Sequence, residues 1–413
     1  MSDGVAGLIA GLVKTHAGVD LPVRLRAWDG SEAGPADGPV LVARTPQALQ
    51  RMLWRPGELG LARAYISGDL EVEGDLTDGL RRMWATIRNG RTGAVPFLPQ
   101  ASAALGAIRA ARRLGLIHWP PPAPPACEIR VSGRRHSRDR DRAVIAGHYD
   151  VTAAFYQLLM DSSMAYSCAY WASDRPGYTL ADAQRDKLEL ICTKLGLQPG
   201  QRLLDMGCGW GSLTVHAASD HRVNVTGVTL SAEQGGFAGQ RIRGLGLGER
   251  AQVLIQDYRD PLEGQFDAAA SIEMGEHVGA ANYPRFCASL FRRLRPGGRL
   301  LIQQMSRGTK APGGGPFIES YITADMTMRP VGETVALVEK AGFEVIGVQA
   351  MREHYVRTIR AWLDNFERNL PEVEKLLTPE QVRVWRLYLA GGALAFEEGR
   401  MGVDQILAVR PPE

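Results

Sequence analysis

The stretch Leu203-Leu-Asp-Met-Gly-Cys-Gly-Trp-Gly211 decides the fold of this chain. An apolar strand ends at Asp205 and runs into a glycine-rich turn that opens a helix. At Gly207 and Gly209 the backbone can approach a ligand closely, and the helix start offers free N–H groups. The spacing is GxGxG, not the GxGxxG of dinucleotide folds, and the lack of GK[ST] excludes a P-loop. The pattern predicts a cofactor site, with a glycine-rich turn that binds nothing as the alternative.

Strands and helices are predicted to alternate after this turn. Short apolar runs of strand length are separated by stretches with helical periodicity, such as 233–243 and 283–294. This alternation is typical of a doubly wound, mainly parallel sheet, so the predicted fold class is α/β. The predicted strands are 202–205, 223–229, 253–256, 266–272, 300–305, 343–348 and 405–409.

Two loops at the carboxyl edge of this sheet carry groups suited to a nucleoside ligand. Thr229, Ser231 and Gln234 follow the second strand and can hydrogen-bond a ribose or an amino-acid group. After the third strand, Asp257 can accept from an adenine amino group and Tyr258 can pack beside the ring. Each signal alone fits a loop cap, but together they predict a nucleoside site.

Two further segments suit chemistry on an apolar substrate. Residues 148–156 and 164–171 are rich in aromatic side chains, which predicts a helical lid over an apolar pocket; core packing of an accessory helix is the alternative. After the fourth strand, the sequence brings Glu273, Glu276 and His277 to the catalytic edge of the sheet. The alternative is that these residues are solvated loop charges. That explanation is reasonable for one of them but less so for all three together.

Length and composition exclude several classes of protein. The chain has 413 residues, 45% hydrophobic and 23% charged, which suits a globular protein of two or three domains. No apolar run approaches the roughly 18 residues of a spanning helix, and no signal-peptide pattern is seen, so we expect a cytoplasmic protein. The five cysteines lack CxxC spacing, which argues against a zinc site or a disulfide framework, and no metal ligands are predicted.

The N-terminal region predicts a small separate domain. The first 20 residues carry the apolar stripe of an amphipathic helix, which we expect to dock on its own domain, with membrane-surface contact as the alternative. Strands predicted at 21–28, 40–43 and 70–72 complete an α+β domain over 1–118. The proline-rich stretch 119–126 predicts an extended linker, and the catalytic domain then spans 127–413.

Positive charge is concentrated between Arg81 and Arg142. This segment contains 13 arginines and 3 acidic residues, although the net charge of the whole chain is only +3. One interpretation is a solvated basic face; the other is a surface for the anionic phospholipids on the inner face of the membrane. Nucleic acid is the weaker choice, because no zinc-finger, RNP-like or helix-turn-helix pattern accompanies the charge.

Several motifs together resemble the cyclopropane fatty acid synthases and mycolic acid cyclopropane synthases over nearly the whole chain. They are residues 60–69, residues 148–171, the GxGWG turn, TLSAEQ, QDYRD, EMGEHVG, His354-Tyr-Val-Arg-Thr358 and Trp385-Arg-Leu-Tyr-Leu-Ala390. The resemblance implies a class I S-adenosylmethionine (SAM) methyltransferase with a Rossmann-like fold. The expected cofactor-binding residues are then Tyr166, Ser167, Asp205, Gly207, Gly209, Trp210, Thr229, Ser231, Gln234, Asp257 and Tyr258.

The resemblance also implies a bicarbonate ion beside the reacting carbons. Its family ligands match the backbone of Cys168, Glu276 and Tyr355. Two positions depart from the family pattern: Gln303 replaces the usual His, and Met305 the usual Ile. A His can relay a proton from bicarbonate, whereas an amide hydrogen-bonds but cannot titrate. We therefore predict that Gln303 orients the ion, and that a methylene branch forms in preference to a cyclopropane ring.

The sequence thus predicts a SAM-dependent C-methyltransferase for the cis double bond of acyl chains in membrane phospholipids. Methyl transfer to an alkene leaves a carbocation, which aromatic faces stabilise and water would trap. Expected partners are the acyl chain, the anionic membrane surface, a second copy of the chain in a homodimer and, for a methylene product, a separate reductase. The alternatives are a methyltransferase for a small unsaturated metabolite and a non-catalytic lipid-binding module. The candidate aromatic faces are Tyr166, Tyr170, Trp171, Tyr258 and Tyr355.

Overall fold

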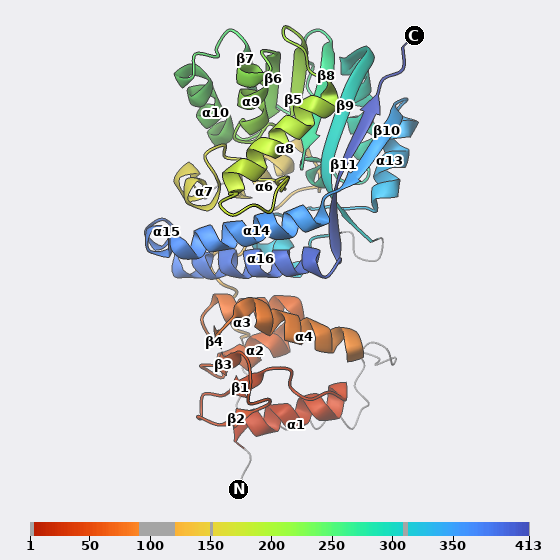
Figure 1. Cartoon of the computed structure of the whole chain (residues 1–413). Coiled ribbons are helices and arrows are strands. Elements are labelled where there is room, and N and C mark those ends of the chain that lie inside the picture. Colours follow the sequence, from red (N-terminus) through yellow and green to blue (C-terminus); the bar gives the residue numbers. More distant parts are fainter. Residues whose placement is uncertain (1–3, 91–119, 149–151, 309–312, 413) are drawn as a thin grey trace. The chain divides into compact units, whose positions relative to one another are not determined.

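Contacts divide the described chain into two compact units. The structure is a computed structural model that describes residues 4–90, 120–148, 152–308 and 313–412 (Figure 1). The smaller unit contains the described residues up to Glu128 together with Thr378–Leu394, and the larger unit contains Ile129–Leu377 and the chain from Ala395 onward. This division differs from the predicted domains, which assigned all of 127–413 to the catalytic part.

The difference lies in α16 (Pro379–Glu397), most of which groups with the smaller unit. Arg383 of this helix forms an ion pair with Glu71 and donates to the carbonyl oxygen of Tyr65 at 3.2 Å. The expected linker also contacts this unit, because Arg51 donates to the carbonyl oxygen of Ala123 at 2.6 Å. Contacts between residues this far apart in the chain leave no local signal in the sequence.

The smaller unit is an α+β fold, as predicted. Its four-stranded sheet has the order β2-β1-β3-β4, in which β1 and β3 are parallel and the outer pairs are antiparallel. The strands are β1 (Arg24–Arg26), β2 (Glu32–Ala33), β3 (Val40–Ala43) and β4 (Leu70–Glu73). The helices before α16 are α1 (Val5–Ala17), α2 (Gln47–Trp54), α3 (Glu58–Ile66) and α4 (Leu76–Gly90).

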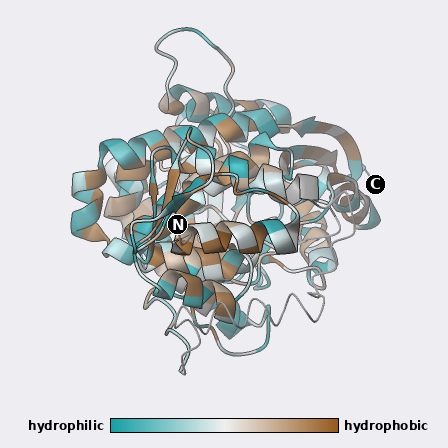
Figure 2. Cartoon of the chain, turned by 90° about the horizontal axis from the view of Figure 1, so that it is seen from below, coloured by the Kyte–Doolittle hydropathy of each residue, from teal (hydrophilic) through white to brown (hydrophobic). Residues whose placement is uncertain are grey.

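Helix α1 docks on the sheet of its own unit. Val5 and Ala6 lie in the same hydrophobic core as Leu25 and Ala48, whereas Leu8 is 46% exposed. Figure 2 shows both hydrophobic and hydrophilic positions along the helix that begins beside the N-terminus. Val5 and Ile9 of the predicted stripe therefore pack within the unit, whereas Leu8 of the same stripe is exposed. Within the described residues, no helix combines the length and the apolar character needed to cross a membrane.

The larger unit contains a seven-stranded sheet with the order β10-β11-β9-β8-β5-β6-β7. The pairs from β9 to β7 are parallel, and β11 is antiparallel to both β9 and β10. Strand order reverses at β5, which lies between β6 and β8, so the loops that follow β5 and its neighbours diverge and leave a crevice. The strands are β5 (Arg202–Met206), β6 (Asn224–Thr229), β7 (Ala251–Ile255), β8 (Phe266–Ile272), β9 (Leu294–Arg307), β10 (Glu344–Ala350) and β11 (Met401–Val409).

Helices cover both faces of this sheet. Adjacent residues of β5 belong to different cores: Leu203 packs with residues of α8 and α9, and Leu204 with residues of α11 and α13. This two-residue period of a buried strand confirms the predicted doubly wound α/β fold. The helices are α6 (Arg138–His148), α7 (Ala153–Leu159), α8 (Leu180–Leu195), α9 (Ser212–Asp220), α10 (Ala232–Gly244), α11 (Tyr283–Arg293), α12 (Pro316–Tyr321), α13 (Val331–Lys340), α14 (Arg352–Arg368) and α15 (Leu370–Leu376).

The aromatic segment around α7 supplies core packing as well as pocket lining. Phe155 and Tyr156 are completely buried, and Phe155 packs edge to face against Phe366 of α14. Tyr166 is only partly buried and lies 5.1 Å, centroid to centroid, from the ring of Trp362. The helices α7 and α14 are therefore joined by a buried aromatic layer, and Tyr166 lies where that layer reaches the pocket described next.

Candidate active site

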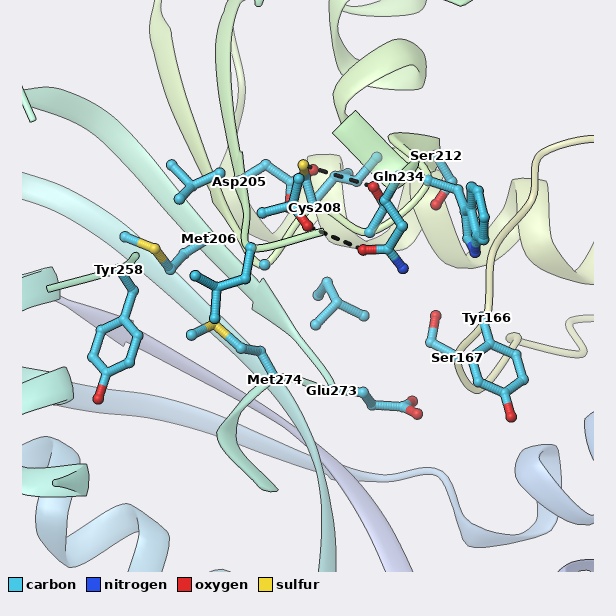
Figure 3. Close-up of a pocket in the computed structure, with 18 of the residues that line it drawn as sticks. Tyr166, Ser167, Asp205, Met206, Cys208, Ser212, Gln234, Tyr258, Glu273 and Met274 are labelled. Carbon is cyan, nitrogen blue, oxygen red and sulfur yellow. Dashed lines mark hydrogen bonds between the residues drawn. The ribbon is translucent and has the colours of Figure 1, made fainter. Parts of the chain in front are cut away.

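A pocket lies at the carboxyl ends of β5, β6 and β8, next to the reversal of strand order (Figure 3). Nine of the eleven predicted cofactor residues line it; the two that do not are Ser231 and Asp257. The nine are Tyr166, Ser167, Asp205, Gly207, Gly209, Trp210, Thr229, Gln234 and Tyr258. The motifs read separately along the sequence thus meet in one cavity.

The glycine-rich turn shapes one wall of this pocket. Gly207 and Gly209 have φ angles of 83° and 52°, a region in which a side chain is strained. Consecutive N–H groups of Gly207 and Cys208 both donate to the carbonyl oxygen of Val228 at 2.9 Å, which fixes the turn against β6. A Cβ at Gly207 would lie 2.9 Å from the side chain of Met274, whereas at Gly209 the nearest atom would be a nitrogen of Gln234 at 3.9 Å. Gly209 is therefore where the backbone leaves room for a ligand.

The loop after β6 presents an amide to the pocket. The hydroxyl of Thr229 donates to Oε1 of Gln234 at 3.0 Å, so the amide nitrogen of Gln234 is left to face the cavity (Figure 3). Ser231 instead caps α10, because its hydroxyl accepts from the backbone N–H of Gln234 at 3.2 Å. Ser231 supports the loop and does not line the pocket.

Asp257 differs most from its expected role at the adenine end. Its two carboxylate oxygens bind Arg259, through the backbone N–H at 2.9 Å and through Nε and Nη2 at 2.6 and 2.5 Å. Its pKa is lowered, because these bonds outweigh the effect of burial, so it is an ionised partner of Arg259. Its neighbour Tyr258 does line the pocket, as expected for a residue that packs beside a ring.

Asp205 and Lys187 are buried ionisable residues that line the pocket, and only Asp205 was predicted. Asp205 accepts from the hydroxyl of Thr214 at 2.7 Å, and burial raises its pKa to about 6. Lys187 of α8 is 1% exposed and donates to the hydroxyl of Ser167 at 2.9 Å; burial lowers its pKa. The sequence did contain a signal for Lys187, because it is a charged residue within the mainly apolar buried stripe of α8.

Glu273 is the centre of the hydrogen-bond network that borders the pocket. Its Oε1 accepts from the backbone N–H of Cys168 at 2.8 Å and from Nε2 of Gln303 at 2.8 Å. Its Oε2 accepts from the hydroxyl of Tyr355 at 2.7 Å. Three of the four residues predicted to be catalytic, namely Cys168, Gln303 and Tyr355, therefore meet at a carboxylate that the sequence analysis left without a specific role.

Glu276 does not occupy the place expected for it. Its Oε1 accepts from the backbone N–H of Met305 at 2.6 Å, and its Oε2 has no hydrogen-bond partner among the described residues. The residue is completely buried, and burial together with the charge of Glu273 raises its pKa to about 8. The other two expected ligands, the Cys168 N–H and the Tyr355 hydroxyl, donate to Glu273 and not to Glu276.

This raised pKa predicts a pH dependence of stability that the variant Glu276→Gln removes. Between its ordinary pKa of 4.5 and about 8, the carboxyl is ionised in the unfolded chain and protonated in the folded one. The folded state binds more protons there, so stability falls as pH rises through this range. Thermal melts at pH 5 and pH 8 measure this effect. Relative to the wild type, the melting temperature of Glu276→Gln should be higher at pH 8 than at pH 5, by about 3 °C or more. An equal difference at the two pH values would contradict the assignment.

The aromatic candidates are divided between the pocket and its surroundings. Tyr166 and Tyr258 line the pocket, and Tyr355 reaches it only through its bond to Glu273. Tyr170 stacks near His354, with centroids 4.8 Å apart, and the indole of Trp171 donates to the hydroxyl of Thr358 at 3.1 Å. These last two residues hold the segment 164–171 against α14.

Away from the pocket, one cysteine and two histidines lie close enough together to be compared with a metal site, although the sequence predicted no metal ligands. Cys192 lies on α8, His216 lies in the middle of α9 and His221 follows its last residue, with potential ligand atoms within 4.8 Å of one another. The CxxC spacing rule does not detect a group assembled from separate segments. Both histidine rings already contact Glu189, at 3.4 and 3.0 Å, and burial raises the pKa of the Cys192 thiol, which favours its neutral form.

Comparison with known proteins identifies the family. The family model for mycolic acid cyclopropane synthetase matches residues 136–406. The chain belongs to this family. It is 36% identical over 412 residues to a probable fatty acid methyltransferase of Pseudomonas putida, an alignment that covers 98% of this chain and 96% of the relative. It is also 35% identical to the cyclopropane-fatty-acyl-phospholipid synthase of Escherichia coli, over 69% of this chain and 73% of the relative.

Solved structures of the mycolic acid cyclopropane synthetase family agree in fold. The mycolic acid cyclopropane synthase CmaA1, complexed with SAH and CTAB, matches with a TM-score of 0.60 and 30% identity, over 65% of this chain and 98% of that one. This member of the family is therefore a SAM-dependent methyltransferase, and its pocket at the GxGxG turn fits SAM.

Proposed function

We propose that the protein transfers the methyl group of SAM to the cis double bond of an unsaturated acyl chain in a membrane phospholipid. One observation carries the proposal: the pocket at the glycine-rich turn is bordered on one side by Glu273, a carboxylate held by three hydrogen-bond donors. A cofactor site next to a buried network of hydrogen-bond donors and acceptors is the arrangement needed to position an alkene for alkylation and to provide for proton removal afterwards.

The named relatives support an acyl chain as substrate. They include fatty acid methyltransferases and a cyclopropane-fatty-acyl-phospholipid synthase. CTAB, which accompanies SAH in the CmaA1 structure, is a surfactant with one long alkyl chain, and SAH is what remains when SAM has lost its methyl group. A relative that binds both the used cofactor and an alkyl-chain surfactant supports a lipid substrate over a small metabolite.

The residues of this chain have to position the alkene, exclude water and accept a proton. When bound, SAM supplies an electrophilic methyl group. Much of the wall around it is apolar or aromatic, including Met164, Trp210 and Ile272, which keeps water from the carbocation left on the acyl chain. Tyr166, which lies on the same side of the pocket as Glu273, offers an aromatic face to that positive charge.

For the product we propose a methylene branch, with a cyclopropane ring as the alternative. Gln303 hydrogen-bonds Glu273 but cannot carry a proton away, which leaves time for a hydride shift before deprotonation. Relatives that align over nearly the whole chain are named fatty acid methyltransferases, one of them a tuberculostearic acid methyltransferase of Mycobacterium tuberculosis. A methyl-branched lipid would then require a separate reductase to saturate the methylene group.

The basic segment between Arg81 and Arg142 supports binding to a membrane surface by a moderate positive charge. Among the arginines of this segment that the structure describes, six have an acidic partner, so the field is weaker than the residue count implies; they are Arg81, Arg82, Arg135, Arg138, Arg140 and Arg142. Residues 91–119 of the segment lie outside the described residues. We propose peripheral binding to anionic lipid on the cytoplasmic face; a homodimer stays a prediction.

Binding to vesicles tests the electrostatic part. Affinity for vesicles that contain anionic lipid should fall as salt rises, because exposed charges are screened beyond a Debye length of about 8 Å near physiological ionic strength. Neutral vesicles of the same size are the control in a sedimentation assay. Equal binding to both kinds of vesicle at every salt concentration would reject the proposed dock.

The proposed reaction can be tested in a host that expresses this chain. Cells fed methyl-labelled methionine should place the label in the acyl chains of phospholipids, as measured by mass spectrometry of extracted lipids. A host with the variant Asp205→Ala, which removes a pocket carboxylate, is the control. Label that appears only in small soluble metabolites would favour the metabolite alternative instead.

A further inference from the structure

We propose that Glu273 is the base that removes the proton in this reaction, and that its carboxylate takes the place of a separate bicarbonate ion. The inference rests on the proposed function, because it assigns the proton-accepting step of that same reaction. It starts from an observation that the family resemblance did not lead us to expect: the donors expected around an external anion already hold an anion that belongs to the chain.

The donor set is complete around Glu273. The backbone N–H of Cys168, the amide of Gln303 and the hydroxyl of Tyr355 come from three separate segments and converge at 2.7–2.8 Å on the two oxygens of one carboxylate. Cys168 and Gln303 are completely buried, and Tyr355 is 5% exposed. Glu273 lines the pocket, and in Figure 3 its carboxylate extends toward Ser167 and Tyr166.

The amide of Gln303 is fixed in the orientation that this role needs. Its Oε1 accepts from Nε2 of Gln405 at 2.9 Å, and the Oε1 of Gln405 in turn accepts from Nζ of Lys194 at 2.6 Å. An ammonium group only donates, so this chain of bonds has one direction and leaves Nε2 of Gln303 facing Glu273. A neutral amide held in this way stabilises a carboxylate without competing for its proton.

The backbone at Glu273 is also arranged for the role. Its φ angle is +51°, a left-handed conformation that is uncommon for a residue with a side chain. The backbone N–H of Glu273 donates to the carbonyl oxygen of Gln303 at 2.7 Å, so β8 and β9 hold the residue in this conformation. Strained backbone at a pocket edge is a common feature of functional sites.

Bicarbonate does not fit the same donors while Glu273 holds them. Two anions at hydrogen-bond distance from one donor set repel each other, and one of them must be protonated or leave. Glu276, the family's expected anion ligand, makes its one hydrogen bond to the backbone of Met305 and has a pKa of about 8, so it is mostly neutral at pH 7. The expected bicarbonate is thus disfavoured by the geometry of this chain.

The proton transfer balances without a further reagent. The alkene pair of electrons forms the new C–C bond to the methyl group as the S–C bond breaks, and the positive charge moves from sulfur to the acyl chain. Glu273 then takes a proton from the methyl group, and the released C–H electrons form either the ring bond or, after a hydride shift, the methylene double bond. Burial raises the pKa of Glu273, which makes the carboxylate a stronger base than an exposed one. The proton leaves Glu273 for solvent after the product has left the pocket.

The test compares purified wild-type protein, Glu273→Gln and Glu273→Gly in methyl transfer to unsaturated phospholipid vesicles, each in bicarbonate-free buffer and with added bicarbonate or formate. Gln keeps the shape of the side chain but cannot accept the proton. Gly accepts the positive φ angle and leaves the three donors open to a small anion. Glu344→Gln, an exposed glutamate on β10, is the matched control. SAM affinity by calorimetry shows that each variant is folded.

We expect the wild type to work equally well with and without bicarbonate. Glu273→Gln should lose about 100-fold or more in rate under every condition, the usual contribution of a general base. Glu273→Gly should lose as much in bicarbonate-free buffer and recover about tenfold or more with bicarbonate or formate. Recovery by an added anion is a readout that a structural role would not give.

Three results would overturn the inference, and they are distinct. A wild type that loses activity when bicarbonate is removed needs the external ion after all, and this comparison involves no substitution. A Glu273→Gln variant with near-normal rate does not use Glu273 as a base. A wild type that methylates no acyl chain under either condition contradicts the proposed function itself, and the assignment of Glu273 falls with it.

Discussion

Gly209→Ala is expected to weaken SAM binding by about 100-fold while the protein stays folded. Gly209 has a φ angle of 52°, and its missing side chain faces the pocket, with only a nitrogen of Gln234 within 4 Å of the place a Cβ would take. A methyl group there fills cofactor space and strains the turn that holds the cofactor. Isothermal calorimetry with SAM measures the effect directly.

Gly200→Ala is the matched control for this variant. Gly200 also has a positive φ angle, 84°, and open space around the Cβ position, but it does not line the pocket. It therefore carries the same kind of backbone strain without a ligand nearby. Equal SAM affinities for the two variants would show that the turn is not the cofactor site. Gly207 is a poorer probe, because a side chain there would meet Met274 whether or not a ligand binds.

Tyr355→Phe is expected to lower the rate at neutral pH by about 10–100-fold, the value of a hydrogen bond to a charged group. The hydroxyl of Tyr355 donates to Oε2 of Glu273 at 2.7 Å, which stabilises the ionised form. Without it the pKa of Glu273 rises further above its ordinary value, so a smaller fraction is ionised at a given pH. The acid limb of the pH–rate profile should move to higher pH, and activity should recover in part in alkaline buffer.

Tyr178→Phe serves as the control for loss of a tyrosine–carboxylate bond. Tyr178 donates to Asp186 on α8, and neither residue lines the pocket. Its removal should leave the pH–rate profile in place. If Tyr355→Phe lowers the rate by the same factor at every pH, Tyr355 positions substrate or supports packing and does not tune Glu273.

The sequence contains the information for the fold of the larger unit because that information is local. Each predicted strand is an apolar run, and the observed β8 (Phe266–Ile272) has the predicted bounds. The GxGxG turn and the loops after β6 and β7 meet because parallel strands bring their carboxyl ends to one edge. The placement of α16 is not local, since its partners Glu71 and Tyr65 lie more than 300 residues away.

The sequence predicted where the site lies, but not which side chains in it are hydrogen-bonded to one another. The resemblance assigned a role to Glu276 by position in a motif, whereas in the structure the donors from distant segments contact Glu273, three residues before it. Cys168 lies 105 residues before Glu273, and Tyr355 lies 82 residues after it. No local pattern determines that choice; the positive φ angle at Glu273, visible only in the structure, goes with it.

Asp257 shows the opposite case, in which a local signal was available. Arg259 stands two residues after it in the same motif, and an arginine that close is the natural partner of a carboxylate. Asp141 of α6 is a second acidic partner of Arg259, because its carboxylate accepts a hydrogen bond from the guanidinium group at 2.9 Å. A charged neighbour within a proposed ligand motif is therefore a reason to expect an internal pair.

In the proposed reaction a methyl group moves from SAM to an alkene carbon, and a proton is then removed from that methyl group. The most direct test is to incubate the purified wild-type protein with trideuteromethyl SAM and vesicles of unsaturated phospholipid, and to measure the product acyl chain by mass spectrometry. We predict a product that retains two of the three deuterium atoms, for a methylene branch and for a cyclopropane ring alike. Retention of all three, or no label in the acyl chain, would contradict the account.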